Sequence, residues 1–493
     1  MKPIKRLILI SILIFPFSLN AQNLRMRASQ FGIRSDGTTM NTTSMQRAID
    51  YIHEHGGGTL EFYVGRYLTG SVHLKSDVHI YLDEAAVLVG STNVYDYWNG
   101  TSVDPLIGAD HQENIGITGK GVIDGRGREL ACNITAQVNE GLIKDKMNLD
   151  RPGCRPNIII FSGCKNVEIK GIILKNACSW VQLYSRCEQM VIDGITVDSK
   201  AFWNNDGLDI DDCSHVKVLN SFIDAADDAI CFKSADTAKV NEDIEIRNCV
   251  ARSSANGIKF GSNICGTYKN FRIVNNKVYD TYRSAVNIAS VDGGVIDNIL
   301  VDSLYAVNVG NAIFVRCGAR NFPGRHSELK NVTIQNVYAE VAATKPDAGY
   351  DYEGPVEDLP RNVSPCGIVG LPDRKIENIS LKNIEIVHPG GGDPFYAKAG
   401  TAPEELDAIP EIRNMYPDFS KFKELPAWGF FIRHVKGLEM ENITLTAKKK
   451  DYRPSIVMVD IQGGTLEGMM FNEPSSKGKE QIIQYKSNVS IKK

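Results

Sequence analysis

The sequence NVEIKG at residues 166–171 decides the fold, because its pattern recurs along most of the chain. A turn residue comes first, apolar residues then alternate with polar ones, and glycine or asparagine ends the phrase. It returns at 189–194 (QMVIDG), 215–220 (HVKVLN), 243–248 (DIEIRN) and 270–275 (NFRIVN), in steps of 23, 26, 28 and 27 residues. Strand-like alternation, repeated at the length of one solenoid coil, predicts an all-β chain folded as a right-handed parallel β-helix.

One short helix is expected before the first coils. Met45, Ala48, Ile49 and Ile52 recur at helical spacing within residues 43–55, which predicts an amphipathic helix. The open end of a solenoid exposes strand edges and apolar core, and a helix in this place would cover them. We therefore expect a short N-terminal capping helix.

Composition fits a single large domain that does not bind nucleic acid. The chain has 493 residues, of which 43% are hydrophobic, and its formal net charge of −4 comes without a basic block. A nucleic-acid partner is therefore disfavoured. A solenoid grows by adding coils, so this length does not require several domains. We expect residues 22–493 to form one β-helix domain, and we expect a monomer.

The first 21 residues are similar to a secretory signal. Three cations stand among the first six residues, an apolar run covers 7–17, and LNA at 19–21 offers a cleavage site. The apolar run is shorter than the roughly 20 residues of a membrane-spanning helix. The sequence therefore predicts a secreted or periplasmic protein without membrane insertion.

The cysteines and the long loops complete the outline. Eleven cysteines cannot all pair within the chain, and Cys164, Cys187 and Cys213 open similar phrases, which fits stacked buried thiols as readily as disulfides. No Cys/His cluster has metal-ligand spacing, so no metal or cofactor is expected. Residues 133–156, 346–365 and 390–426 break the repeat and are expected to be loops that wall a cleft. We expect the polar tail, 475–493, to be loosely held.

Three carboxylates fall where polar turns pass into short apolar strands. They are Asp206 in WNNDGLDI (203–210) and Asp227 and Asp228 in DDAI (227–230), and NGIKFGS (256–262) follows one coil later. Asp206 and Asp228 are 22 residues apart, about one coil. Residues one coil apart stack with backbones roughly 4.8 Å apart, so these acids should meet on one face.

Strand alternation assigns the neighbouring side chains to two faces. Leu208, Ile230 and Ile258 should point into the core, whereas Asp209, Cys231, Lys233 and Lys259 should point outward. Asp206, Asp228 and Asn256 then share one level on three successive coils, with Asp227 beside them. Carboxylates this close cannot all ionise easily, so at least one pKa should rise. A protonated acid beside an ionised one is what cleavage of a glycosidic bond requires.

These motifs resemble glycoside hydrolase family 28, which contains the polygalacturonases and rhamnogalacturonases. NNDGLD (204–209) matches the family's Asn-x-Asp-Gly-x-Asp, Asp227-Asp228 matches its paired aspartates, and YLTG (67–70) and HLKS (73–76) are also similar. The resemblance implies a pectin-lyase-like β-helix in which Asp227 is the general acid. It implies that Asp206 and Asp228 activate water for single displacement with inversion.

Two departures from the family concern substrate binding. The family's Gly-His-Gly appears as Ala255-Asn256-Gly257, and its Arg-Ile-Lys, which grips a galacturonate carboxylate, aligns with Asn287-Ile288-Ala289. Lys259 lies one coil before Asn287 on the same face, so its ammonium should reach the space of the missing arginine. The sugar at the cut is then either neutral or an acid held by Lys259 alone. The residues expected to bind substrate are Asn204, Asp209, Asn256, Lys259 and Asn287.

The function expected from the sequence is an exported, inverting glycoside hydrolase of pectin-like polysaccharide or oligosaccharide, with exo attack because long loops close one end of the groove. A polysaccharide lyase is one alternative, although it needs a base and usually Ca²⁺ to neutralise the uronate. A non-catalytic carbohydrate-binding β-helix is another. Structural alternatives stay open for several residues. Asn256 could be a stacked asparagine and Lys259 a solvated lysine, and the residues that could serve packing alone are Trp428, Arg433 and His434.

Overall fold

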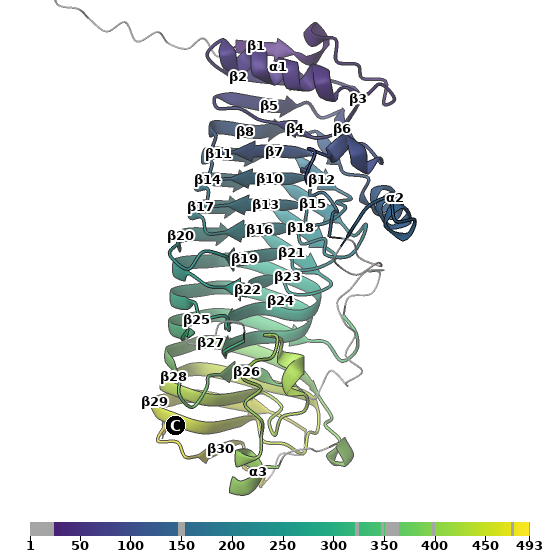
Figure 1. Ribbon diagram of the computed structural model, residues 1–493. Helices are drawn as coiled ribbons and strands as arrows, with labels where there is room; N and C mark the ends of the chain where they lie inside the picture. The colour runs from purple at the N-terminus through teal and green to yellow at the C-terminus, as the bar shows by residue number, and fades with distance from the viewer. Residues whose placement is uncertain are drawn as a thin grey trace, which may run out of the picture.

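The computed structural model describes residues 24–145, 153–320, 325–346, 350, 364–396, 400–474 and 478–492. Its strands form one continuous sheet that winds as a parallel β-helix, and Figure 1 shows the coils stacked from β1 (Leu24–Arg27) at one end to β30 (Ile482–Tyr485) at the other. The predicted fold class is therefore confirmed. The predicted signal at 1–21 lies outside the described residues.

The regular coils each contribute three short strands, one to each side of the β-helix. The first coils hold β2 (Gly58–Phe62), β3 (Gly65–Thr69), β4 (Val72–His73), β5 (Val78–Leu82) and β6 (Ala86–Gly90). The following coils hold β7 (Ile107–Asp110), β8 (Glu113–Gly119), β9 (Val122–Asp124), β10 (Ile159–Ser162), β11 (Lys165–Lys170), β12 (Ile173–Lys175), β13 (Gln182–Ser185), β14 (Glu188–Asp193) and β15 (Thr196–Ser199). Next come β16 (Leu208–Asp211), β17 (Ser214–Leu219), β18 (Phe222–Ala225), β19 (Ile230–Ser234), β20 (Val240–Arg247), β21 (Val250–Ser253) and β22 (Ile258–Ile264).

Beyond β22 the strands run on through the bends of the coil. The long strands are β23 (Thr267–Ser290), β24 (Val295–Cys317), β25 (Glu328–Val341), β27 (Ile376–Gly390), β28 (Phe430–Lys449) and β29 (Ile456–Asn472), and β26 (Cys366–Val369) and β31 (Ser490–Lys492) are short. Because β30 and β31 pair with β29, the expectation of a loosely held tail is wrong for the described residues 478–492. Their backbone groups are held by the last coil.

The repeated phrase works because both of its ends turn the chain. Its first residue has a positive φ in successive coils, with values of 52° at Asn166, 59° at Gln189 and 55° at His215. Asn248 and Asn275 end later copies, also with positive φ, a conformation that asparagine tolerates better than most residues. Asn275 Nδ2 donates to Asn248 Oδ1 at 2.7 Å, so the turns are linked from coil to coil.

The core follows from the alternation within the phrase. Leu208 pairs with Ile230, Ile230 with Ile258, and Ile258 with Val286, and all four side chains are buried. Stacking of identical positions lets each coil cover the apolar row of the previous one. The predicted inward residues are therefore confirmed, and the register fixes which residues share the outward face.

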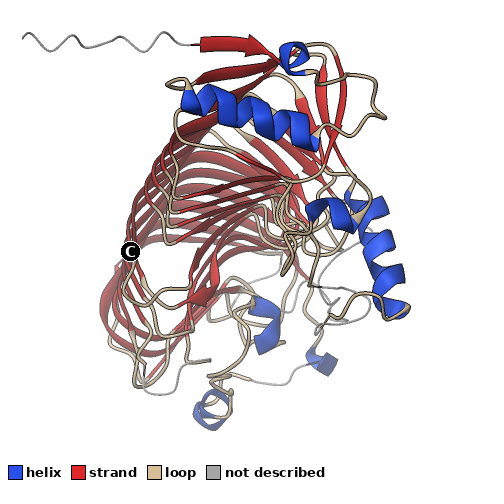
Figure 2. Cartoon of the chain, turned by 45° about the horizontal axis from the view of Figure 1, so that its top comes forward, coloured by secondary structure: helices blue, strands red, loops and turns tan. Residues whose placement is uncertain are grey.

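Helices lie at the end and on the sides of the β-helix. The capping helix is confirmed as α1 (Thr42–Glu54), which buries Met45, Ala48, Ile49 and Ile52 and lies across one end of the stack in Figure 2. Within the described residues the other helical segments are α2 (Gly127–Asn139), α3 (Pro403–Asp407), η1 (Ala28–Phe31), η2 (Val94–Tyr97), η4 (Pro394–Tyr396) and η5 (Phe419–Phe422).

Helix α2 corrects the expectation of a loop from residue 133 onward. It buries Leu130, Ala131, Ile134 and Val138, which recur at helical spacing and give the helix one apolar face. Among the described residues no helix is long and apolar enough to cross a membrane.

All eleven cysteines are free thiols. Cys164, Cys187 and Cys213 are buried, and the backbone N–H of Cys187 donates to Cys213 Sγ at 3.3 Å. Of the two alternatives left open by the sequence, the structure therefore has stacked thiols.

Candidate active site

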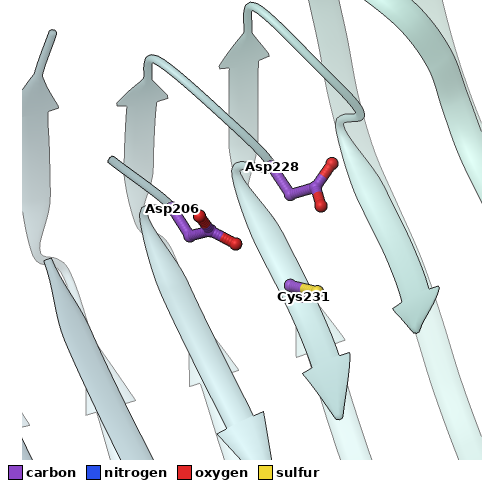
Figure 3. Close-up of side chains that lie close together, drawn as sticks. All are labelled: Asp206, Asp228 and Cys231. Carbon is purple, nitrogen blue, oxygen red and sulfur yellow. The ribbon is translucent and has the colours of Figure 1, made fainter. Parts of the chain in front are cut away.

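The acids occupy the turns that lead into β16 and β19. Gly207 N donates to Asp228 O at 2.9 Å, and Ala229 N donates to Asn256 O at 2.9 Å, so the turns stack coil on coil. Figure 3 shows Asp206 and Asp228 on two neighbouring coils, with Cys231 on the strand that follows Asp228. A carboxylate oxygen of each acid and Cys231 Sγ all lie within 4.8 Å of one another. The predicted meeting of Asp206 and Asp228 on one face is therefore what the structure contains.

The motif has a glycine at position 207 because the neighbouring coil leaves no room for a side chain there. A Cβ added at Gly207 would lie 2.4 Å from Ile223 Cγ2 and 2.7 Å from Ala229 O. Gly257, at the equivalent place two coils later, would meet Val278 Cγ1 at 2.6 Å. At these two positions a side chain would meet the neighbouring coil, whereas Ala229 fills the equivalent place on the coil between them.

Asp228 is the carboxylate that the site holds ionised. Its Oδ1 accepts hydrogen bonds from Asn256 Nδ2 at 2.7 Å and Asn256 N at 3.1 Å, and its Oδ2 accepts one from Lys259 Nζ at 2.6 Å. Burial alone would raise the pKa of Asp228, but the Lys259 ammonium and these hydrogen bonds outweigh burial and lower it. Asn256 and Lys259 therefore act on Asp228.

Among the acids that solvent can reach, Asp227 is the one that keeps its proton most readily. It is half-buried, and its Oδ1 accepts from Asp228 N at 2.9 Å. Burial and then repulsion from Asp228 raise the pKa of Asp227 above its ordinary value. Asn204 Nδ2 lies 3.4 Å from Asp227 Oδ2, so the predicted Asn204 also lies at the site. A raised pKa beside an ionised neighbour is the arrangement of a general acid.

Asp206 and Asp209 both contact the same lysine. Lys233 Nζ lies 3.2 Å from Asp206 Oδ2 and also bonds to Asp209 Oδ1. Burial, and then the nearby charge of Asp209, raise the pKa of Asp206. Burial raises the pKa of Asp209 to about 6. Asp206 and Asp209 thus hold the Lys233 ammonium between them, and Asp206 also lies within 4.8 Å of Asp228.

Asp209 is a correction to the sequence-based assignment. Its side chain points out of the β-helix core, as alternation predicts, but it is fully buried. Its strand neighbours Leu183 and Cys231, together with Lys233, cover it, so it does not face a substrate. Alternation predicts the direction of a side chain, whereas burial depends on what packs over that face.

Lys259 and Asn287 are covered by residues 400–426, which we call the covering segment. Lys259 Nζ donates to Tyr416 Oη at 2.6 Å, and Asn287 Nδ2 donates to Pro417 O at 2.9 Å. The Lys259 side chain is 3% exposed. The ammonium is therefore held between Asp228 and Tyr416 and does not extend freely into the place of the family arginine. The alternative of a solvated lysine is wrong.

Several residues of the site were not assigned from the sequence. Arg155 donates to Asn204 Oδ1 at 3.0 Å, so the predicted loop at 133–156 does contribute to the site. The Trp180 ring centroid is 4.4 Å from Lys233 Nζ. Arg283 and Arg320 lie beside Tyr416. These residues lack the repeat spacing that made the acids recognisable.

A sequence signal for the covering segment does exist. FFI at 430–432 and IVMV at 456–459 are unbroken apolar runs, which are typical of strands buried on both faces. Their outward members Phe431 and Val457 pack in a second buried cluster with Leu406, Phe419 and Phe422 of the covering segment. The cover over the C-terminal coils was therefore open to prediction, although its contacts with the acids were not.

The donor set does not fit a metal ion. Asp206, Asp228 and Cys231 are close enough to share one, but Lys233 Nζ lies 3.2 Å from Cys231 Sγ and Lys259 Nζ lies 2.6 Å from Asp228. Burial raises the pKa of Cys231, and its thiol donates to Gly261 O at 3.0 Å. Two ammonium groups already neutralise the ligands that a cation would need.

Two curated relatives that the chain resembles are named as a galacturonosidase and a polygalacturonase. The chain is 22% identical to the exo-poly-alpha-D-galacturonosidase of Dickeya chrysanthemi, over 77% of this chain and 64% of that protein. It is 24% identical to a probable polygalacturonase of Vitis vinifera, over 62% of this chain and 59% of that protein. The chain therefore spans less than two thirds of the length of these relatives.

Solved structures support the fold. The exopolygalacturonase of Thermotoga maritima superposes with a TM-score of 0.60 at 23% identity, covering 74% of this chain and 87% of that one. The family 28 exopolygalacturonase of Yersinia enterocolitica gives 0.59 at 18% identity, covering 95% and 78%. The sequence pattern described as "Glycosyl hydrolases family 28" matches residues 60–349, more than half of the chain. The chain belongs to glycosyl hydrolase family 28, as its motifs predicted.

Proposed function

We propose that this chain is an exo-acting, inverting glycoside hydrolase of pectin-like polysaccharides or oligosaccharides. Family membership supports the enzyme class, and the names of the relatives favour galacturonate-containing substrates. The observation that carries the proposal is the pairing of Asp227, whose pKa is raised, with Asp228, whose pKa is lowered. One group can donate a proton while its neighbour accepts one.

In the proposed reaction Asp227 protonates the glycosidic oxygen as the bond from that oxygen to the anomeric carbon breaks. A water molecule attacks the anomeric carbon from the opposite side and gives its proton to Asp228. Asp206, within 4.8 Å of Asp228, holds the water through a hydrogen bond, and the ionised Asp228 stabilises the positive charge of the transition state. Asn256 and Lys259 keep Asp228 ionised and oriented. A single displacement of this kind inverts the anomeric configuration.

Exo attack is supported by the way the covering segment closes one end of the strand column. Ala319 N donates to Arg413 O at 2.8 Å, and Arg316 Nη2 donates to Glu411 O at 2.7 Å. With Pro417 on Asn287, these contacts hold the segment against the coils that follow the acids. In Figure 1 the segment lies beside β26, in the lower half of the stack. A groove closed there would admit the end of a chain more readily than its middle.

The alternatives from the sequence are less well supported. A lyase usually needs Ca²⁺ to neutralise the uronate, whereas Lys233 and Lys259 are buried and bonded to the aspartates that would hold the ion. A non-catalytic binding protein has no need for acids with opposed pKa shifts. We also propose export and a monomeric state, which rest on the sequence.

One set of incubations tests the proposal. The protein is incubated with oligogalacturonides, rhamnogalacturonan oligosaccharides and polygalacturonate. We expect new reducing ends and early release of short products, without the ultraviolet absorbance of an unsaturated sugar. Proton NMR of the first-formed product should show the inverted anomer. A retained anomer would contradict the assignment of Asp206 and Asp228, and an absorbing product would identify a lyase.

A further inference from the structure

Tyr416 of the covering segment stands among three cations beside the acids. Its ring centroid is 5.0 Å from Lys259 Nζ, 5.6 Å from Arg320 Cζ and 6.0 Å from Arg283 Cζ. The three cations come from β22, from β23 and from the chain after β24. Positive charge is thus gathered next to the acids, although the family's Arg-Ile-Lys is Asn287-Ile288-Ala289 in this chain.

The three cations differ in the hydrogen-bond donors that remain. Lys259 is committed to Asp228 and Tyr416 and is 3% exposed. Arg320 donates from both Nε and Nη2 to Asp292, at 2.9 Å each. These contacts leave Lys259 little access to solvent, and among the described residues Arg320 Nη1 donates no hydrogen bond.

Arg283 has the free edge that a ligand requires. Its Nε lies 2.9 Å from Asp418 Oδ2, and its side chain is 12% exposed. Within the described part of the chain its terminal nitrogens donate no hydrogen bond, and none of its nitrogens is a buried group without a partner. The Nε end is fixed by the covering segment, and the edge formed by Nη1 and Nη2 is left for another acceptor.

Arg283 also lies within electrostatic reach of the reaction. Its positive charge lowers the pKa of Asp227, opposing burial and the charge of Asp228, and both acids raise the pKa of Arg283. Ser284, the next residue, donates its N–H to Asn256 Oδ1 at 3.2 Å, so the backbone that carries Arg283 is linked to the residue that orients Asp228.

We propose that Arg283, held by Asp418 and lying beside Tyr416, binds the carboxylate of the uronic acid at the cut in place of the family's missing Arg-Ile-Lys. The guanidinium presents a planar fork that matches the two oxygens of a carboxylate, which a lysine does not. This inference rests on the proposed hydrolase function. It replaces the sequence-based choice between a neutral sugar and an acid held by Lys259 alone.

The test compares one substrate with and without its negative charge. kcat/KM is measured for an oligogalacturonide and for its fully methyl-esterified form, with the wild-type protein and with Arg283→Gln. We expect the wild type to prefer the acid and Arg283→Gln to reduce that preference by about 10- to 100-fold, the range of a lost charge-assisted hydrogen bond. Arg283→Lys should restore part of the preference. Arg272→Gln, which changes an exposed arginine of the same strand β23, is the matched control.

The ratio of the two substrates separates recognition from catalysis. If Arg283→Gln slows both forms equally, Arg283 acts only on Asp227 and Asp228, and the inference is wrong. An unchanged preference in Arg283→Gln, or a wild-type protein that prefers the ester, would also overturn it. If the wild type cleaves neither form, the proposed function fails instead. Calorimetric binding of trigalacturonate and its ester to the wild type and Arg283→Gln then still decides the inference, because binding requires no turnover.

Discussion

One row of outward side chains runs along the strand column of the site, and its two halves differ. In one half the row passes from Asp209 through Cys231 and Lys259 to Asn287. In the other half it continues from Phe314 through Gly367 and Phe431 to Val457. The backbone register is continuous across the change, so only the side chains decide what each half does.

The difference shows that the same coil geometry can carry catalytic side chains in one half and anchor the covering segment in the other. The polar half holds Asp209 and Lys259, whose charges shift the pKa values of Asp206 and Asp228 beside it. The apolar half anchors the covering segment through Phe314, Phe431 and Val457. The segment then reaches back over the boundary, where Tyr416 and Pro417 contact Lys259 and Asn287. Activity should therefore depend on the polar half and stability on the apolar half.

The largest expected effect is on turnover, from a change beside the polar half. Asp227→Asn is nearly isosteric but has no proton to donate, so kcat should fall by about 10²- to 10⁴-fold. The midpoint of thermal unfolding should hardly change, because Asp227 is only half-buried. The measurements are initial rates on a good substrate and a thermal scan. Asp243→Asn, an exposed carboxylate on β20, is the control, and more than a tenth of wild-type activity in Asp227→Asn would refute the general-acid role.

The second effect is on stability, from the apolar half. Phe431 is fully buried between β28 and the covering segment, so Phe431→Ala should lower the free energy of unfolding by about 3–5 kcal/mol. Denaturant titration followed by tryptophan fluorescence measures the change, with Phe431→Leu as the milder variant. The acids should keep their opposed pKa values in the folded protein. A stable Phe431→Ala protein without activity would break the division between the two halves.

The sequence predicted the polar half better than its surroundings, for a physical reason. The acids follow the coil period, so Asp206, Asp228 and Asn256 could be aligned by counting residues. Tyr416 reaches Lys259 from 157 positions further along the chain, and no period relates the two. Alternation likewise gave the direction of Asp209 and Lys259 but not their burial, because burial depends on Lys233 and on the covering segment.

The third effect is a change in pH dependence from within the polar row. Lys259 outweighs burial and lowers the pKa of Asp228, so Lys259→Met should raise that pKa. The acid limb of the kcat/KM profile should move to higher pH, since Asp228 must be ionised to accept a proton. Lys269→Met, an exposed lysine of β23, is the matched control. An acid limb that stays in place would mean that Lys259 does not set the ionisation of Asp228.

Lys259→Met should also change the way in which the stability of the folded protein depends on pH. In the wild type the lowered pKa of Asp228 stabilises the folded state above the unfolded pKa, and this stabilisation is lost as pH falls through the folded pKa. With the pKa raised in Lys259→Met, the folded state should instead lose stability as pH rises above the unfolded pKa, because the unfolded chain ionises there while the buried Asp228, without the Lys259 ammonium, keeps its proton. The loss should be smaller than the roughly 3–5 kcal/mol of an uncompensated buried charge, because Asp228 can stay protonated.

The smallest expected effect lies at the boundary between the halves. Asn287 Nδ2 donates to Pro417 O at 2.9 Å, whereas Asn287 Oδ1, although buried, accepts no hydrogen bond from the described residues. Asn287→Ala therefore removes this bond, a longer one of 3.4 Å from Asn287 Nδ2 to Asn256 Oδ1, and the unmade interaction of Oδ1, and the net change should be about 0.5–1.5 kcal/mol. Because the apolar half still anchors the covering segment, that loss should appear as local opening of the segment and not as unfolding of the coils.

Hydrogen exchange should quicken at residues 411–420, KM should rise by less than about tenfold, and the unfolding midpoint should change little. Asn139→Ala, at an exposed position of α2, should do none of this. If Asn287→Ala instead speeds exchange in β22 and β23, the boundary residue supports the coils themselves, and the two halves are not separable.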